Sequence, residues 1–306
     1  LDKEVYDNSV AFGKKVGEQV WLRAKDDNYL KSRSKPKYLG SEEPGKWRPT
    51  PPDYLDGVEF CWNEIHALVL DSASQFLPPP PPPYTMDSNS TFYNMVKEVY
   101  TVSNNLTPEQ LEIARFWDDN PFVIEHAGHL TFGTKKITPG GHWMGIAAIA
   151  ARQTGAGVVK TALTYALTSA SLLDAFISSW DAKYKWSYVR PITVIHEYWQ
   201  KDWKPLLQTP PFPEYTSGHS TITAAAATVL THLYGDNFAF NDTSDLRYIG
   251  MQRKFTSFYQ AADECSVSRL YGGIHYRLST DEGARAGRKV GELVVNRLGR
   301  KVGPQP

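Results

Sequence analysis

Apolar residues recur at helical spacing along much of the chain. In the segment from Val158 to Trp180, positions 162, 163, 166, 167, 170, 173, 176, 177 and 180 are apolar, which places them on one face of a helix of about six turns. Runs that alternate β-branched and polar residues, as strands do, are almost absent. The pattern therefore predicts an all-α protein with a bundle-like arrangement of helices.

The N-terminal third is more irregular. Residues 1–30 and 58–76 are expected to be helical, and residues 31–56 between them are rich in Pro, Lys, Gly and Ser, which indicates an irregular connection. Six prolines at 78–83 end the second helix and require polyproline II. We interpret this run as a stiff spacer rather than an SH3-like ligand, although an interaction protein that presents the prolines is an alternative hypothesis.

Local signals mark further helix starts. Thr107 with Gln110 forms a capping box around a proline at the first helical position. Ser217 precedes an alanine-rich helix that runs to Leu233, and Ser279 with Glu282 is expected to cap the final helix. We expect one domain over 1–306, made of N-terminal helices and connections (1–106) and a helical bundle (107–306).

Composition excludes several classes of protein. The 306 residues contain 33 basic and 33 acidic side chains, so neither a globally basic nucleic-acid binder nor an acidic tail protein is supported. The two cysteines, Cys61 and Cys265, exclude a disulfide-dense scaffold and a multi-cysteine metal module. Polar residues interrupt the long apolar segment 158–177, so we infer no membrane span.

Three short motifs carry candidate chemistry. Lys183 and Arg190 lie seven residues apart, about two helical turns, so both cations can face one direction. Pro191 is expected to force Arg190 out of the helical conformation or close to a helix end. Ser217 and Gly218 open a helix, where backbone N–H groups and the helix dipole attract anions. Each motif alone is more often an ordinary solvated face or an N-cap.

The third motif places Arg269 and His275 on either side of the glycine pair 272–273, which permits a sharp reversal. Together the motifs supply three cations, a hydroxyl, backbone N–H groups and, with His219, two imidazoles. That set could enclose a tetrahedral oxyanion by charge-assisted hydrogen bonds while one histidine bonds to its central atom.

The order of these motifs is similar to a known superfamily. K-x6-R-P, then S-G-H, then S-R-x5-H, between Lys183 and His275, resembles the vanadium-dependent haloperoxidases and type 2 phosphatidic acid phosphatases. F-W-D-D-N-P at 116–121 and T-P-G-G-H-W at 138–143 look like bacterial haloperoxidase sequences. The family usually has Pro where this chain has Thr216, which could loosen the turn or add a capping hydroxyl.

The resemblance implies a role for each matching residue. His275 is the expected covalent ligand of vanadate, and His219 the acid–base residue, which a helix N-terminus would keep neutral. The groups expected to bind the vanadate oxygens are Lys183, Arg190, Ser217, Gly218 and Arg269. The implied reaction is oxidation of a halide by hydrogen peroxide to hypohalous acid through a peroxovanadate that Lys183 polarises.

An acid phosphatase is the alternative reading, because phosphate and vanadate are both tetrahedral oxyanions. His275 would then be the nucleophile and His219 would protonate the leaving group. Trp180 and Phe212, which match aromatic positions of haloperoxidases, favour a dry halide pocket, although plain core packing explains them equally well. Iodide is the favoured halide because it is the easiest to oxidise, with bromide as an alternative.

The other polar residues have plainer interpretations. Satisfied structural histidines are expected at His66, His126, His129, His142, His196 and His232, with the possibility that His142 lies near the pocket. Asp118 and Asp119 are interpreted either as partners of an arginine or as helix-end charges.

The remaining expectations concern partners and location. Hydrogen peroxide, a halide and small organic acceptors are the expected partners, with no nucleic acid and no membrane, and the sequence leaves the oligomeric state open. The chain begins at Leu1 without an export signal, from which we expect a removed signal or a longer protein. The resemblance suggests a periplasmic or secreted location.

Overall fold

The computed structural model describes residues 2–121, 123–133 and 136–299. In chain order the elements are α1 Lys3–Lys25, α2 Tyr29–Arg33, the 3-10 helix η1 Trp62–Glu64, α3 Thr91–Ser103, α4 Pro108–Phe116, β1 Ile124–Ala127, β2 Leu130–Gly133, α5 Pro139–Gln153, α6 Val158–Trp186, α7 Pro191–Tyr198, α8 Gly218–Tyr234, β3 Phe240–Asp242, α9 Leu246–Ile249, β4 Arg253–Phe255, α10 Phe258–Tyr271 and α11 Arg277–Leu298. The predicted helical fold is confirmed, with two short antiparallel ribbons, β1–β2 and β3–β4, added to it.

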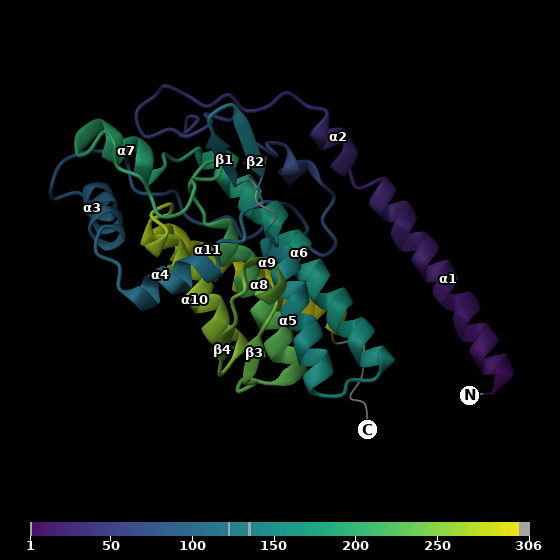
Figure 1. Cartoon of the computed structure of the whole chain (residues 1–306). Coiled ribbons are helices and arrows are strands. Elements are labelled where there is room, and N and C mark those ends of the chain that lie inside the picture. Colours follow the sequence, from purple (N-terminus) through teal and green to yellow (C-terminus); the bar gives the residue numbers. More distant parts are fainter. Residues whose placement is uncertain (1, 122, 134–135, 300–306) are drawn as a thin grey trace.

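Helix α8 lies inside the bundle and contacts α5, α6, α10 and α11 (Figure 1). It is buried from residue 220 to residue 231, where alanines and threonines dominate. Small side chains let the neighbouring helices approach closely. At Gly287 of α11, a Cβ atom would lie 2.0 Å from the carbonyl oxygen of Thr221. The bundle therefore holds the N-terminus of α8 firmly.

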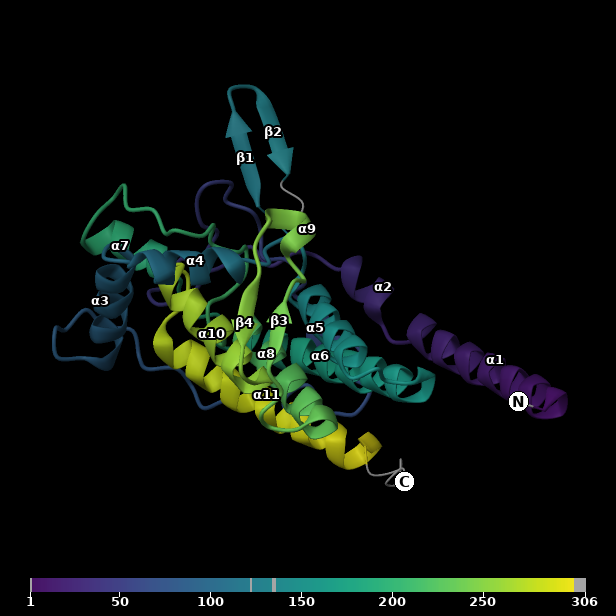
Figure 2. The same cartoon turned by 60° about the horizontal axis from the view of Figure 1, so that its bottom comes forward.

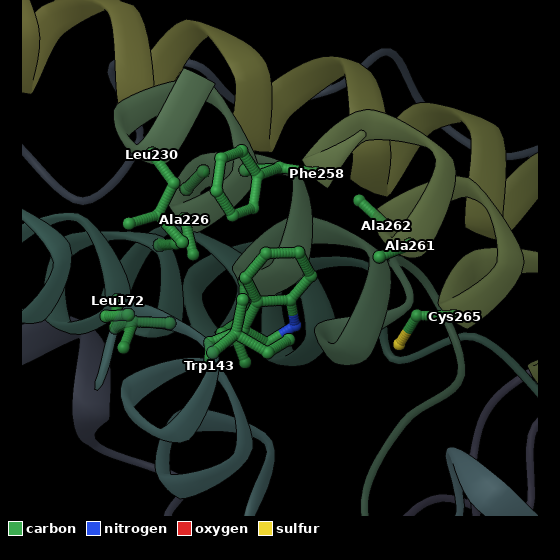
Figure 3. Close-up of a cluster of buried hydrophobic side chains, with 14 of the residues drawn as sticks. Trp143, Leu172, Ala226, Leu230, Phe258, Ala261, Ala262 and Cys265 are labelled. Carbon is green, nitrogen blue, oxygen red and sulfur yellow. The ribbon is translucent and has the colours of Figure 1, made fainter. Parts of the chain in front are cut away.

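The main hydrophobic core lies between these helices. Figure 3 shows Trp143 of α5 and Leu172 of α6 facing Leu230 of α8 and Phe258 of α10. Trp143, Leu230 and Phe258 are 0% exposed. Burial of such large apolar side chains contributes about 1.5–3 kcal/mol each. This core joins four helices that are distant in sequence.

The helix predicted over 58–76 is wrong. Only the three residues of η1 are helical there, and a buried carboxylate on α6 explains the difference. Asp174 accepts hydrogen bonds of 2.8 Å from the backbone N–H groups of Leu68, Val69 and Leu70. Since these donors bond to a side chain, they do not bond to the carbonyls of a preceding helical turn. An irregular segment is thereby fastened to α6.

The predicted N-terminal helix is present in two pieces, α1 and α2. No residue of α1 is buried, and Figure 2 shows α1 directed away from the bundle. The proline run after η1 lies against the body: Tyr215 donates to the carbonyl of Pro79 and Tyr188 to that of Pro82, at 2.8 and 2.7 Å. These two hydrogen bonds hold the proline run against the bundle.

Two predictions about helix starts have opposite outcomes. The capping box of Thr107 and Gln110 at the start of α4 is confirmed. The cap predicted at Ser279 is wrong, because α11 begins at Arg277 and its N-cap is Tyr276. Ser279 lies within the first turn, where its hydroxyl contacts the carbonyl of Glu214 at 3.4 Å. Ser279 therefore makes a long-range contact with Glu214 instead of the local N-cap that its residue type suggested.

In the described part of the chain, no helix combines the length and apolar character needed to cross a membrane.

The ribbon β1–β2 projects from the bundle (Figure 2). Its strands pair from Ile124 opposite Gly133 to Ala127 opposite Leu130. The second ribbon pairs Phe240 with Phe255 and Asp242 with Arg253. It lies beside α5 and brings Asp242 close to the candidate site.

Candidate active site

Lys183 and Arg190 come from different helices. Lys183 lies in the last turn of α6, Ser187 ends that helix in a left-handed conformation (φ 45°), and Arg190 is the N-cap of α7. Arg190 is thus outside a helix, as its position before Pro191 predicted, and the two cations do not share two turns of one helix. A chain reversal brings them together instead, and both side chains are 0% exposed.

The Lys183 ammonium supports the loop that leads into α8. Its Nζ donates hydrogen bonds to the carbonyl oxygens of Pro213, Glu214 and Thr216, at 3.0, 3.2 and 2.5 Å. Burial, followed by the charge of Arg190, holds the pKa of Lys183 well below its usual value. Lys183 thus positions the loop while adding positive charge beneath it.

Backbone carbonyls anchor both arginines. Arg190 donates from Nε to Phe212 (2.9 Å) and from Nη1 to Ile274 (2.8 Å), and Arg269 donates from Nη1 to Trp117 (2.7 Å). Within the described residues, Arg190 Nη2 and Arg269 Nε are buried without a hydrogen-bond partner. Burial lowers the pKa of Arg190 to about 10, and Arg269 lowers it as well. These fixed guanidinium groups retain donors for an anion.

The start of α8 is built as the sequence predicted. Ser217 is the N-cap, and its Oγ accepts hydrogen bonds from the N–H of Ser220 at 3.3 Å and from the Ser220 hydroxyl at 2.9 Å. Gly218 follows, and a Cβ atom there would lie 3.1 Å from the ring of Trp180. The Thr216 hydroxyl does not provide the cap; it has no partner among the described residues.

Two histidines lie beside these cations. His275 is 2% exposed, and His219 Nε2 is buried without a partner in the described part of the chain. Burial, followed by the charges of Arg269 and Lys183, holds the pKa of His219 well below its usual value. The direction agrees with the sequence argument, but burial and neighbouring cations are the causes rather than the helix N-terminus alone.

Sequence reasoning missed Glu214. Its carboxylate is 0% exposed and accepts a 2.7 Å hydrogen bond from His275 Nδ1 and a 3.0 Å bond from the N–H of Tyr276. Burial raises the pKa of Glu214 to about 7, although Arg190 and Lys183 oppose the rise. The only available signal was an acidic residue three positions before Ser217, because its contact with His275 spans 61 residues.

A cavity of about 140 Å³ lies beside several of these groups. Its lining includes Gly218, His219, Arg269 and His275 together with the aromatic residues Trp62, Phe176, Trp180 and Phe212. The rings of Trp180 and Phe212 lie 5.1 Å apart between centroids. The predicted aromatic residues therefore adjoin the predicted anion-binding residues in one small cavity.

A second buried cluster adjoins the cavity through Asp119. His142 lies 3.0 Å from both oxygens of Asp119 through Nδ1 and 2.9 Å from Asp242 through Nε2. Asp245 lies 3.7 Å from Nδ1. Burial lowers the pKa of His142, but the carboxylates of Asp119 and Asp242 raise it further, to well above its usual value. His142 is thus a hydrogen-bonded histidine close to the cavity.

The remaining predicted residues lie elsewhere. Asp118 forms an ion pair with Lys136, and its charge and that of Asp119 both act on Arg269. His196 Nε2 lies 2.6 Å from the carbonyl of Trp203, and His129 is exposed at the tip of the β1–β2 ribbon. The side chain of His126 is outside the described part of the structure.

Comparison with known proteins assigns this arrangement to a family. Residues 163–304 match the model of the second helical-bundle domain of vanadium chloroperoxidase. A bacterial vanadium-dependent iodoperoxidase structure is 49% identical, with a TM-score of 0.87, over 96% of this chain and 69% of that chain. The chain belongs to the vanadium-dependent haloperoxidases. It is an enzyme of the family that oxidises halides with hydrogen peroxide.

More distant haloperoxidases share the fold. The holo and apo structures of a bacterial vanadium-dependent chloroperoxidase are each 18% identical to this chain, with TM-scores of 0.65 and 0.66. Each comparison covers 85% of this haloperoxidase and 62% or 63% of the chloroperoxidase chain. No curated protein sequence matches the chain.

The residues present fit the vanadate cofactor that the family implies. Three cations, Lys183, Arg190 and Arg269, are at most 1% exposed, and each of the two others lowers the pKa of Lys183. Unpartnered nitrogen donors on both arginines are buried. An oxyanion satisfies such donors and offsets the repulsion between the cations. The chemistry of this site therefore suits a small tetrahedral anion.

Proposed function

We propose that this haloperoxidase oxidises iodide with hydrogen peroxide, using vanadate held by His275. The observation that supports this most is a cavity lined both by His219 and Arg269, which have buried, unpartnered nitrogens, and by the aromatic residues Trp180 and Phe212. The 49% identity to an iodoperoxidase supports iodide as the halide. Bromide is the second candidate.

Anion binding is assigned to groups that the fold holds in place. Arg190 and Arg269 donate from the nitrogens that backbone carbonyls leave unused, and the N-terminus of α8 adds the N–H of Gly218 and the Ser217 hydroxyl. Lys183 contributes charge, and its hydrogen bonds to the carbonyls of Pro213, Glu214 and Thr216 hold the loop that leads into α8. Little rearrangement is then needed on binding.

When bound, vanadate supplies a Lewis-acidic vanadium(V) centre that activates peroxide without changing its own oxidation state. His219 is assigned as the acid–base group, because its unpartnered Nε2 lines the cavity and its lowered pKa keeps the imidazole neutral at neutral pH. It accepts the proton that peroxide loses. The surrounding cations favour the neutral form until that step.

The aromatic wall is assigned to the halide. Iodide is large and weakly hydrated, and Trp180 and Phe212 offer an apolar surface that excludes water from the reacting side of the cavity. Lys183 lies 4.9 Å from the centre of the Phe212 ring, so positive charge stands directly behind the wall. The aromatic surface and the nearby ammonium therefore favour a weakly hydrated anion, although Glu59 and Asp119 also line the cavity.

The test is iodide oxidation by hydrogen peroxide, measured before and after addition of vanadate. We expect activity only after vanadate is added, and we expect inorganic phosphate to inhibit it competitively. The apo-protein is assayed beside it with a chromogenic phosphomonoester. Efficient ester hydrolysis together with no vanadate-dependent iodide oxidation would overturn the proposal in favour of a phosphatase.

A further inference from the structure

Glu214 has a carboxylate that contacts the predicted vanadate ligand but does not line the cavity. Its Oε1 accepts from both His275 Nδ1 (2.7 Å) and the N–H of Tyr276 (3.0 Å). Its Oε2 is buried without a partner among the described residues. Both the glutamate and the histidine are nearly inaccessible to solvent, at 0% and 2%. The contact is therefore protected from water.

The backbone of Glu214 is held from three directions. Its N–H donates to the carbonyl of Tyr188 at 3.0 Å. Its own carbonyl accepts from Lys183 Nζ at 3.2 Å and from the Ser279 hydroxyl at 3.4 Å. These contacts come from α6, the α6–α7 connection and α11. These hydrogen bonds fix the backbone of Glu214, and they therefore also fix the point from which its carboxylate contacts His275.

The neighbours of His275 select one tautomer of its ring. Tyr276 already occupies Oε1 as a donor, and a carboxylate oxygen can only accept, so His275 Nδ1 carries the hydrogen. On the other side, Arg190 Nη1 lies 3.2 Å from Nε2, and a guanidinium can only donate. Two independent contacts thus require a lone pair on Nε2, the form of imidazole that can bind a metal.

We propose that Glu214 is a positioning residue that holds His275 in the Nδ1–H tautomer and directs its Nε2 lone pair at the bound oxyanion. This inference rests on the proposed role of His275 as the vanadate ligand. The competing explanation is that Glu214 only balances the charge of the buried cations Lys183 and Arg190. The two explanations predict different results for variants that remove the charge of residue 214 with or without its hydrogen-bond acceptor.

Glu214→Gln and Glu214→Leu distinguish the loss of charge from the loss of the hydrogen-bond acceptor. Gln keeps an oxygen that can accept from His275 Nδ1 but removes the charge, whereas Leu removes both. A positioning role predicts that Gln retains vanadate affinity within a few fold and that Leu loses about 10–100-fold. Pure charge balance predicts that both variants change alike and bind anions more tightly, because a repelling charge is gone.

Titration calorimetry of the apo-protein with orthovanadate and with inorganic phosphate provides the first readout. Phosphate needs the cations but no bond to His275 Nε2, so we expect its affinity in Glu214→Leu to be unchanged or higher while vanadate affinity falls. Asp174→Asn is the matched control, since Asp174 is an equally buried carboxylate outside the cavity. Equal responses of Gln and Leu would overturn the inference.

Ring-nitrogen NMR of histidine-labelled apo-protein is the second readout. We expect wild-type His275 to be protonated at Nδ1 and unprotonated at Nε2, and Glu214→Leu to lose this preference. An Nε2-protonated ring in the wild type would contradict the inference even if the leucine variant failed to fold. Vanadate binding without iodide oxidation would instead count against the proposed function and leave the role of Glu214 standing.

Discussion

His219 and His275 line one cavity, yet their hydrogen-bond partners differ. His275 is held on both sides of its ring by Glu214 and Arg190. His219 has no partner for Nε2 in the described structure. A ring fixed by two contacts suits a ligand, and a ring with an unused nitrogen suits proton transfer.

We expect His219→Ala and His275→Ala to fail in different ways. The His219 variant should retain vanadate while its kcat for iodide oxidation falls by about 10²–10⁴-fold, the usual contribution of a positioned acid–base group. The His275 variant should no longer retain vanadate after gel filtration. His129→Ala, on the exposed ribbon, is the control and should match the wild type.

Steady-state kinetics and metal analysis of the same preparations check this prediction. Wild-type turnover in the His219 variant would contradict the acid–base role of His219. Full vanadate retention in the His275 variant would remove the role of that residue as a ligand.

Among the elements, α8 depends most on the packing of its neighbours. It carries Ser217, Gly218 and His219 at its N-terminus, and α11 crosses it at a point where Gly287 meets the Thr221 backbone. No side chain can be accommodated there unless one helix moves. The distance between these two helices thus contributes to the geometry of the anion site.

We therefore expect Gly287→Ala to destabilise the protein by about 1–3 kcal/mol, as overpacking does, and to weaken phosphate binding to the apo-protein. Gly13→Ala is the matched control, because α1 is exposed and no atom lies within 4 Å of a Cβ atom there. It should be neutral or stabilising by up to about 1 kcal/mol. Urea unfolding and phosphate titration measure both effects; equal behaviour of the two variants would contradict the packing argument.

At the scale of the whole molecule, a zero net charge conceals two buried regions of opposite sign. Lys183, Arg190 and Arg269 form the positive region, and the carboxylates around His142 form the negative one. Asp119 connects them, because it bonds to His142 and also lines the cavity. Such buried charge makes stability sensitive to pH.

Asp245 provides a measurable case. Burial, followed by the charge of Asp119, raises the pKa of Asp245 from 3.8 to about 7 in the folded protein. The folded state therefore holds a proton that the unfolded state releases between these values, and stability falls as the pH rises through this window. Asn resembles the protonated form, so Asp245→Asn should gain stability relative to the wild type, reaching at most about 4 kcal/mol above pH 7.

Urea unfolding of the apo-proteins between about pH 4 and pH 8 tests this expectation. Asp263→Asn, an exposed carboxylate on α10, is the control and should show no comparable trend. A stability gain for Asp245→Asn that decreases as the pH rises would contradict this expectation.

The sequence by itself determined the features that depend on neighbouring residues. Helical periodicity predicted α6, the Thr107 capping box predicted α4, and Ser217 predicted the start of α8, because each signal lies within a few residues of what it controls. The three motifs indicated an oxyanion site only when they were taken together in their order along the chain.

Only the tertiary structure decided which distant groups meet. Asp174 determines that residues 68–70 are not helical, a chain reversal rather than one helix pairs Lys183 with Arg190, and Glu214 contacts His275 across 61 residues. Hydrogen bonds to buried carboxylates and carbonyls are selected by the packing of whole helices, because an unpaired polar group inside the core is costly. Local sequence patterns therefore do not predict such partners.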